Sequence, residues 1–382
     1  MTSRERVKTV LSHKPPDKIP LGFFSIDCDT VEKILGHDTY LRAKAKSQIA
    51  FWEGRRDEVI ESWKNDFIEL YKKLDIIDII NLSPMTTAFA PPKNYKPEAP
   101  KKIDETTWEL KDGTILKYSD LTKDLTIARK SNDEMAFKTY EEKDYNFEEE
   151  IVPPDKSQFE VVDAILDAFK DDNKYIIGAG FDEGIFTPPA DMEYYDHPEW
   201  VTKACKAALK RANAMDKYVY KKEYDGVMWG ADFSYNSGPF ISPQMFREFL
   251  FPYIKSRVEN VKRYGLDVHK HACGNNWKLM DMFIEMGYDA YQSIQESAGM
   301  DTKKVKELYG DKLTLWAGPQ VETLTSGTTE DIKKEVRKFF EIAGDGSGFI
   351  FSTSHSVAVG TKYENFMTML DEFKKLNDRY FL

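Results

Sequence analysis

Long hydrophobic runs are missing from this chain of 382 residues. No apolar stretch approaches the roughly 18 residues that a membrane-spanning helix requires. The N-terminal segment, residues 1–20, lacks an apolar core followed by a small-residue cleavage site, so it indicates no secretion signal. We therefore expect a cytoplasmic protein that does not enter a membrane.

Cysteine is scarce as well. The chain has three cysteines, Cys28, Cys205 and Cys273, an odd number at wide spacing. Together with the missing secretion signal, this argues against a framework of disulfide bonds. Each cysteine has to be interpreted separately.

An excess of basic residues is also absent, because the formal net charge is −11. A polyanion gains nothing by approaching a surface of the same sign, so nucleic acids and anionic membranes are not expected as partners. Hydrophobic residues make up 41% of the chain and charged residues 31%, which is the range of ordinary globular proteins. The chain thus has enough apolar material to bury one large core.

Short β-branched or apolar segments recur along the chain, and from the third onward they alternate with amphipathic helical patterns. A helical segment that starts at Ser242-Pro243 and ends at Gly265 carries the expected start and stop signals. This alternation predicts a single (β/α)8 TIM barrel over residues 1–382, with a doubly wound open sheet as the alternative. The eight expected strands are residues 18–24, 75–82, 174–180, 225–233, 266–273, 290–296, 313–319 and 348–354.

The alternation is interrupted over about residues 83–150. The sequence TTWELKDGTILKYSD alternates around an Asp-Gly pair, which is typical of an antiparallel β-hairpin. We interpret this region as an insertion near the barrel mouth. The acidic run that follows, residues 140–157, is expected to be a solvated connection.

The stretch VHKHACGNN combines histidine and cysteine at alternate positions. On a strand, His269, His271 and Cys273 would share a face, with Cys273 at the carboxyl end, where the active sites of barrel enzymes lie. His355 follows the last expected strand and would reach the same mouth. Zn²⁺ accepts imidazole and thiolate ligands, and His271, Cys273 and His355 would leave one position open, as a catalytic zinc requires. The alternative is a buried cysteine beside a hydrogen-bonded core histidine.

Acidic residues follow other expected strands, namely Asp182, Glu183, Asp232 and Glu296. One of them is expected to occupy the fourth metal position in the resting state, and we favour Glu296. The alternative for each is a helix N-cap or a hydrogen bond to a metal ligand.

Aromatic side chains are expected at the same rim, where they could hold a planar substrate. Packing in the barrel core is the alternative. These residues are Phe181, Trp229, Phe233 and Tyr235.

Three long segments carry a resemblance to a known family. They begin at SRERVKTVLSHKPPDKIPLGFF, at GADFSYNSGPFISPQMFREFLF and at LTLWAGPQVETLTSG. The chain resembles the uroporphyrinogen decarboxylase superfamily throughout, except in the hairpin region. The resemblance implies a (β/α)8 barrel with its site at the carboxyl-terminal mouth.

Two branches of that superfamily differ after the first strand. The decarboxylases carry an arginine-rich segment there, whereas this chain reads FFSIDCDTVEKILG, which disfavours tetrapyrrole decarboxylation. HACG and HSVAVGTKYEN are similar to two segments of the zinc-dependent corrinoid methyltransferases, with His355 at the position of a family cysteine. Replacing a thiolate by a neutral imidazole leaves the zinc more positive, which suits polarising a hard oxygen.

The resemblance implies a methyltransferase that moves a methyl group from a methoxy compound, with an aryl methyl ether expected, to cob(I)alamin on a partner corrinoid protein. Asp232 and Glu296 are the expected catalytic residues. Methyl transfer from a methylated corrinoid to a thiol such as coenzyme M, decarboxylation of a porphyrin-like substrate, and non-catalytic binding of a tetrapyrrole or of the corrinoid protein remain alternatives. The expected substrate-binding residues are Phe181, Asp182, Tyr235 and Asn236.

Overall fold

A parallel β-sheet forms the centre of the computed structural model, which describes residues 1–83, 90–130, 150–178 and 193–380. Seven strands are hydrogen-bonded in chain order, and every neighbouring pair is parallel. They are β1 (Ile79–Asn81), β6 (Tyr175–Gly178), β7 (Gly226–Trp229), β10 (Asp267–His271), β11 (Ala290–Gln292), β12 (Thr314–Ala317) and β13 (Phe349–Phe351).

The segment around Leu21 takes the eighth strand position and closes the sheet into a barrel. Gly22 N donates to Phe351 O at 3.0 Å, and Phe351 N donates to Pro20 O at 2.9 Å. On the other side, Asp78 N donates to Leu21 O at 2.8 Å. Since the last strand returns to the first through this segment, the doubly wound alternative is excluded, and the predicted (β/α)8 barrel with its eight strand segments is confirmed.

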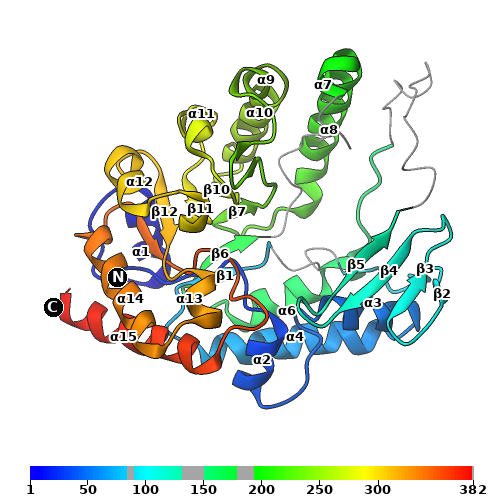
Figure 1. Ribbon diagram of the computed structural model, residues 1–382, viewed down its shortest axis with the longest axis horizontal. Coiled ribbons are helices and arrows are strands. Elements are labelled where there is room, and N and C mark those ends of the chain that lie inside the picture. Colours follow the sequence, from blue (N-terminus) through cyan, green and yellow to red (C-terminus); the bar gives the residue numbers. More distant parts are fainter. Residues whose placement is uncertain (84–89, 131–149, 179–192, 381–382) are drawn as a thin grey trace.

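Helices surround the barrel and connect its strands (Figure 1). Several begin at the signals that the sequence carries: Thr328 and Asp331 form a capping box, and the Ser242 side chain caps the helix that starts at Pro243. The helices are α1 (Ser3–Leu11), α2 (Cys28–Leu35), α3 (Lys44–Trp52), α4 (Arg56–Lys73), α6 (Glu160–Ala168), α7 (Glu193–Asp196), α8 (Pro198–Val219), α9 (Pro243–Phe249), α10 (Phe251–Lys262), α11 (Met280–Met286), α12 (Thr302–Tyr309), α13 (Val321–Ser326), α14 (Thr329–Ala343) and α15 (Tyr363–Tyr380), with the 3₁₀ turns Lys156–Phe159, Trp277–Leu279 and Glu296–Ala298.

Helix α1 closes the amino-terminal end of the barrel. Its Val7 and Val10 are completely buried and pack with Tyr175 and Trp316 in the barrel interior. Three cations on this helix pair with an aspartate at or just before the start of a strand. The pairs are Arg4–Asp225 at 3.0 Å, Arg6–Asp78 at 2.6 Å and Lys8–Asp267 at 2.7 Å.

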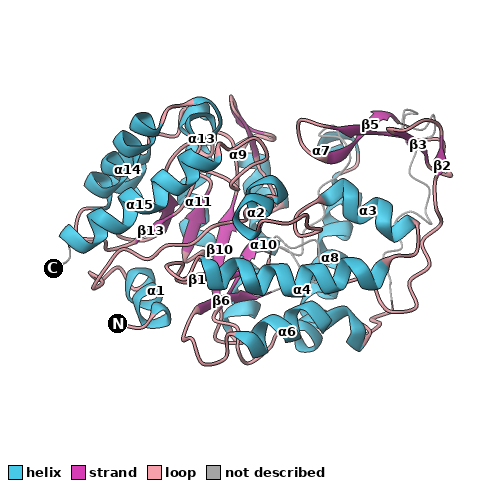
Figure 2. Ribbon diagram, turned by 90° about the horizontal axis from the view of Figure 1, so that it is seen from below, coloured by secondary structure: helices cyan, strands magenta, loops and turns pink. Residues whose placement is uncertain are grey.

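The insertion after β1 contains a separate antiparallel sheet. The predicted hairpin is present as β3 and β4, with Gly113 at φ +85° in the turn between them, a conformation that favours glycine. The sheet packs on α3, where the rings of Trp52 and Trp108 lie 5.9 Å apart (Figures 1 and 2). Of the acidic connection over residues 140–157, residues 140–149 lie outside the described residues. The four strands are β2 (Lys101–Lys102), β3 (Thr107–Glu109), β4 (Ile115–Ser119) and β5 (Asp124–Arg129).

Within the described residues, no helix combines the length and the apolar character that crossing a lipid bilayer demands.

Candidate metal centre

Three potential metal ligands meet at the carboxyl end of the barrel. His271 is the last residue of β10, Cys273 lies two residues beyond it, and His355 follows β13. One ligand atom from each of the three lies within 4.8 Å of the other two. Because His271 is buried while Cys273 and His355 are partly exposed, the group is accessible from the mouth of the barrel.

The imidazole of His271 is held in one tautomer. Its Nδ1 is hydrogen-bonded to the Gln292 side-chain oxygen, and the Gln292 amide nitrogen donates to Thr353 O at 3.2 Å. If the Gln292 amide were turned over, its oxygen would face the Thr353 carbonyl oxygen, and two acceptors would oppose each other. The Gln292 oxygen therefore faces His271, and Nδ1 carries the proton. The lone pair therefore resides on Nε2, which points toward Cys273 Sγ at 3.6 Å.

Two polar side chains contact Cys273, one at its thiol and one at its backbone. Its Sγ lies 3.0 Å from Ser293 Oγ, and its backbone N donates to an Asp232 carboxylate oxygen at 2.7 Å. Burial, together with the negative charge of Asp232, raises the pKa of the Cys273 thiol to about 11. A thiolate at this position thus requires a compensating cation, which a bound metal ion would supply.

The loop after Cys273 is shaped by a close approach to the hairpin of β8 (Ser234–Tyr235) and β9 (Gly238–Pro239). Gly274 has a φ of +82°, and a side chain there would lie 2.3 Å from Ser234 O. Asn276 is completely buried, donates to Ala272 O and Cys273 O, and accepts from Ser234 Oγ at 2.8 Å. These contacts fix the backbone on which Cys273 is placed.

His355 shares an aromatic wall with His271. The ring of Phe24 stacks on His271 with centroids 4.0 Å apart and lies 6.2 Å from the ring of His355. Burial lowers the pKa of His355, and burial lowers that of His271 to about 3, so both imidazoles are neutral at physiological pH. Neutral imidazole is the form that binds a metal.

The donor set fits Zn²⁺. Two neutral imidazoles and one thiol are ligands that this borderline-soft ion accepts, and three protein ligands are what catalytic zinc sites use. Gln292 also provides the hydrogen bond that a metal-binding histidine commonly makes through its other nitrogen.

Two of the carboxylates predicted from the sequence, Asp232 and Glu296, lie outside the group of three ligands. Asp232 is exposed and accepts from the Cys273 backbone, so it supports the loop. Glu296 pairs with Lys338 on α14 at 2.6 Å, and its backbone N donates to Gln320. The structure thus directs Glu296 to a helix of the outer layer. Asp182 and Glu183 lie outside the described residues.

The predicted aromatic rim is only partly present. Trp229 and Phe233 are buried in the core between strands and helices, which is the alternative that the sequence left open. Tyr235 is 59% exposed and packs on Phe240, while the neighbouring Asn236 accepts a long hydrogen bond from Gln295 at 3.5 Å. Phe181 lies outside the described residues.

Sequence reasoning missed Phe24, Gln292 and Ser293. Gln292 is the direct neighbour of His271 in the register between β10 and β11. Only this register brings the two together, because nothing in the segment AYQSIQE distinguishes Gln292 from Gln295. Phe24 was placed on the first strand segment, but the stacking on His271 depends on barrel closure.

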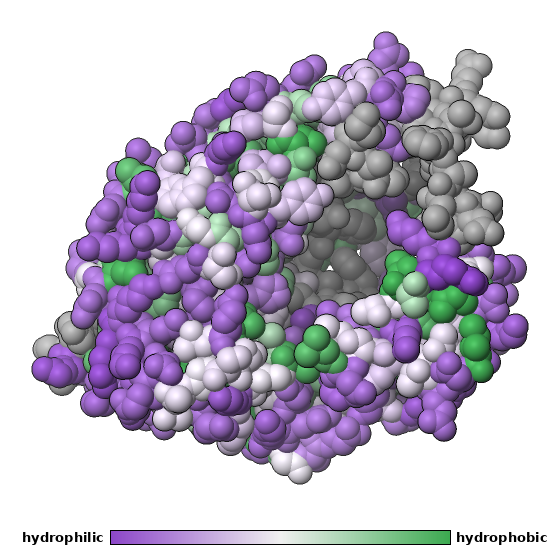
Figure 3. Space-filling view, in the orientation of Figure 1, coloured by the Kyte–Doolittle hydropathy of each residue, from purple (hydrophilic) through white to green (hydrophobic). Residues whose placement is uncertain are grey.

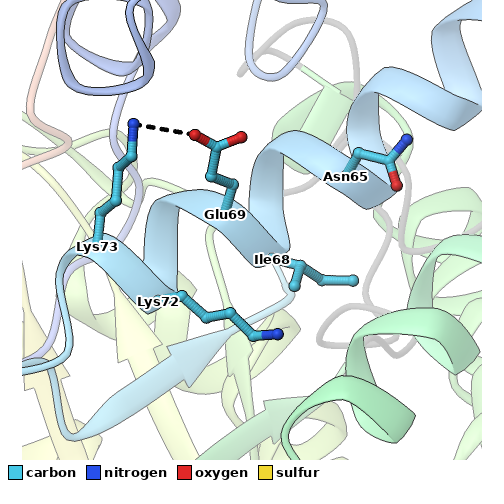
Figure 4. A pocket seen from close by; sticks show the side chains of 5 residues that line it. All are labelled: Asn65, Ile68, Glu69, Lys72 and Lys73. Atoms are coloured by element: carbon cyan, nitrogen blue, oxygen red, sulfur yellow. Dashed lines mark ion pairs between the residues drawn. The ribbon is translucent and has the colours of Figure 1, made fainter.

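The surface also has hollows away from the three candidate ligands. One on the outer face of α4 is lined by residues of that single helix, including the Glu69–Lys73 ion pair at 2.9 Å (Figure 4). The face drawn in Figure 3 is hollowed between the barrel and the sheet β2–β5, and hydrophobic residues border the hollow on the side of that sheet.

Comparison with known proteins agrees with the fold. A solved structure of a methyltransferase from Methanosarcina mazei matches with a TM-score of 0.64 over 98% of this chain and 99% of that one, at 15% sequence identity. This likeness, at such low identity, extends the barrel fold over the whole chain.

Sequence comparison finds a match to a known family in the C-terminal half of the chain. Residues 192–376 match the uroporphyrinogen decarboxylase (URO-D) family. Two uroporphyrinogen decarboxylases, from Chlorobium luteolum and Chlorobium phaeovibrioides, are 28% and 26% identical to this chain over 144 residues, which are 37% of this chain. The aligned part spans 40% of the length of each relative. Through residues 192–376, which contain all three candidate ligands, this chain is similar to the uroporphyrinogen decarboxylase family.

Proposed function

We propose that this protein is a zinc-dependent methyltransferase. It takes a methyl group from a methoxy compound, with an aryl methyl ether as the first candidate substrate, and passes it to cob(I)alamin on a partner corrinoid protein. The bond between oxygen and the methyl carbon breaks, a bond between carbon and cobalt forms, and the phenolate leaves and takes up a proton. The partner's corrinoid supplies the nucleophile.

One observation carries this proposal: His271, Cys273 and His355 converge at the barrel mouth with their ligand atoms within 4.8 Å of one another. These are the residues at which the sequence resembles the zinc-dependent corrinoid methyltransferases. The structural neighbour from Methanosarcina mazei is a methyltransferase, which supports the same proposal. A purely structural core histidine would not need its Nε2 directed at a thiol.

The residues of this chain prepare the site for such a reaction. A zinc ion held by the three ligands would supply positive charge to polarise the ether oxygen and to stabilise the leaving phenolate. Gln292 directs the lone pair of His271 to the ligand cluster, and Asp232 holds the backbone of Cys273. Phe24 covers one face of His271 and so excludes water from that side.

The choice of an oxygen substrate follows from the charge of the ligands. One thiolate with two neutral imidazoles leaves a divalent cation with a net charge of +1, whereas two thiolates would leave none. The more positive site favours polarisation of an ether oxygen over activation of a thiol. The replacement of a family cysteine by His355 is the residue change that makes this difference.

Metal content and substrate range test the proposal. We expect stoichiometric zinc in the purified protein, and methylation of a reduced corrinoid protein by methoxybenzoates. Methanol, methylamines, coenzyme M and uroporphyrinogen form the comparison panel. A folded protein without zinc, or activity confined to thiols, methylamines or uroporphyrinogen, would overturn it.

The variant His355→Cys tests whether a site with one thiolate and two imidazoles is needed for activity toward ethers. It should retain zinc but lose activity toward ethers, because the added thiolate lowers the charge at the metal. His197→Cys is a matched control, since His197 precedes α8 and lies outside the ligand group. Unchanged ether activity in His355→Cys would contradict the charge argument and leave the zinc site itself standing.

A further inference from the structure

Two consecutive polar residues at the end of β11 face the candidate ligands of β10. Gln292 and Ser293 are both completely buried. Gln292 is hydrogen-bonded to His271 Nδ1, and Ser293 Oγ lies 3.0 Å from Cys273 Sγ. β11 itself provides none of the three ligands, yet it contacts two of them.

Regular strand geometry does not allow this arrangement. Successive side chains of a strand point to opposite faces, so Ser293 should point away from the barrel interior that Gln292 faces. Ser293 instead has a φ of +79°, in the left-handed region that non-glycine residues rarely adopt. This backbone turn brings both neighbouring side chains to the ligand side.

The conformation of Ser293 is costly, and this indicates that its hydroxyl is used. Glycine would adopt the same backbone conformation without the steric penalty of a side chain. Strained residues of this kind persist where surrounding structure holds them, and they cluster at functional sites. The contact that the hydroxyl makes in return is the one to Cys273 Sγ.

Gln292 connects two of the ligand-bearing segments. Its oxygen accepts from His271, and its nitrogen donates to Thr353 O, two residues before His355. The Thr353 hydroxyl in turn donates to His355 O at 2.5 Å. A displacement of Gln292 would therefore release the ring of His271 and loosen the segment that carries His355.

We propose that Gln292 and Ser293 are paired positioning residues that preset the His271 tautomer and hold Cys273, and that zinc affinity depends on both. This inference rests on the proposed function, because it requires that the ligands bind zinc. Outer partners of this kind typically contribute about 10- to 100-fold in metal affinity. The pair acts through the ligands and need not contact the substrate.

Zinc affinity of purified, full-length variants tests the inference, measured by competition with a chromogenic chelator. Gln292→Leu, Ser293→Ala and Ser293→Gly should each weaken zinc binding by about 10- to 100-fold. Gln292→Glu should give an affinity between that of Gln292→Leu and that of the wild type, because a carboxylate still accepts the Nδ1 proton but cannot donate to Thr353 O. Substitution with Co²⁺ should give altered absorption bands in the Ser293 variants, since the hydroxyl contacts the sulfur ligand.

Melting temperatures separate positioning from a merely structural role. Ser293→Gly should keep or raise the melting temperature while it weakens zinc binding, because it removes the strain and the hydroxyl together. Asn173→Gly is the matched control: Asn173 has a φ of +51° far from the site, so it should change stability without changing zinc affinity. Gln295→Leu controls for the loss of a nearby glutamine, since the Gln295 amide bonds Gly274 N, Asn236 and Ser297 rather than the side chain of a candidate ligand.

The outcomes distinguish this inference from the proposed function. If the wild-type protein binds zinc, and Ser293→Gly and Gln292→Leu bind it equally well, the inference is wrong and the proposed function stands. If Gln292→Leu does not fold, the zinc affinities of Ser293→Ala, Ser293→Gly and Gln292→Glu still test the inference. If the wild-type protein binds no zinc, the proposed function fails and the inference fails with it.

Discussion

His269 and His271 lie two residues apart on the same strand, and they belong to opposite ends of the barrel. His269 Nε2 is hydrogen-bonded to the Tyr175 hydroxyl at 3.0 Å, and that hydroxyl donates to Asp267 at 2.7 Å. His271 contacts Gln292, and its free lone pair points toward Cys273. The same inward face of one strand thus carries a packing histidine and a candidate ligand.

The difference arises from what covers each end of the barrel. Helix α1 closes the amino-terminal end with apolar side chains and with cations that neutralise the aspartates of the strand starts. At the carboxyl end, polar side chains converge and keep lone pairs available. Barrel enzymes commonly separate stability from reactivity in this way. The comparison therefore predicts that changes at one end alter folding, and that changes at the other alter metal binding.

The largest effect is expected when each of the two histidines is replaced separately. His271→Ala should lose stoichiometric zinc and reduce methyl transfer by more than the roughly 100-fold expected for an outer partner. His269→Phe should keep zinc, because His269 packs against Trp316 and Tyr175 only within the barrel interior. Elemental analysis and circular dichroism check both variants. Loss of zinc in a folded His269→Phe protein would show that the two ends are not separate.

At the closed end, Arg6→Ala should lower the free energy of unfolding by about 3 kcal/mol, because it leaves Asp78 buried without its cation. The side chains of Arg6 and Asp78 are only 14% and 8% exposed. Arg4→Ala is the control, since Arg4 is 43% exposed and should cost at most about 1 kcal/mol. Urea unfolding measures both. A drop in zinc affinity with unchanged stability would contradict the assignment of this end to folding.

The stability of the protein in acid also tests the role of the amino-terminal end of the barrel in folding, and the expected change in stability is smaller. Burial raises the pKa of Asp17, but the hydrogen bonds from Arg6 outweigh it and hold the pKa at about 2, below its ordinary 3.8. A lowered pKa stabilises the fold above pH 3.8, and this contribution is lost as the pH falls toward 2. The melting temperature of Asp17→Asn should therefore lie below that of the wild type at neutral pH and converge with it in acid. A constant difference across this range would refute the linkage.

The smallest expected effect concerns Glu296. Glu296→Gln removes a partly exposed ion pair with Lys338, which should cost at most about 1 kcal/mol and leave zinc affinity unchanged. Lys338→Met breaks the same pair from the other side and should behave alike. If zinc affinity falls in Glu296→Gln but not in Lys338→Met, the carboxylate reaches the metal after all, as the sequence had suggested.

Much of the fold was predictable because its signals are local. The alternation of apolar and amphipathic segments identified all eight strand positions, and Asp112-Gly113 identified the hairpin of the insertion. The convergence of His271, Cys273 and His355 was also predictable, since the carboxyl ends of parallel strands meet at one mouth whatever their separation in sequence.

The supporting residues were not predictable, because they depend on contacts between strands. The sequence favoured Glu296 as a metal partner on its charge, whereas the structure pairs it with Lys338. Trp229 and Phe233 are aromatic, as a substrate rim would require, but they pack against helices: Trp229 contacts Arg257 of α10, and Phe233 contacts Phe246 of α9. A single sequence does not reveal which face a residue takes after a strand ends.

By itself, the sequence determined the barrel and the identities of the three candidate ligands, because hydrophobic periodicity and strand ends follow from local chain geometry. The tertiary structure decided which residues support these candidate ligands. It did so through the register that sets Gln292 opposite His271, and through the left-handed turn at Ser293 that brings a second polar side chain to Cys273. Register and turn depend on the packing of the whole barrel, which a local pattern does not contain.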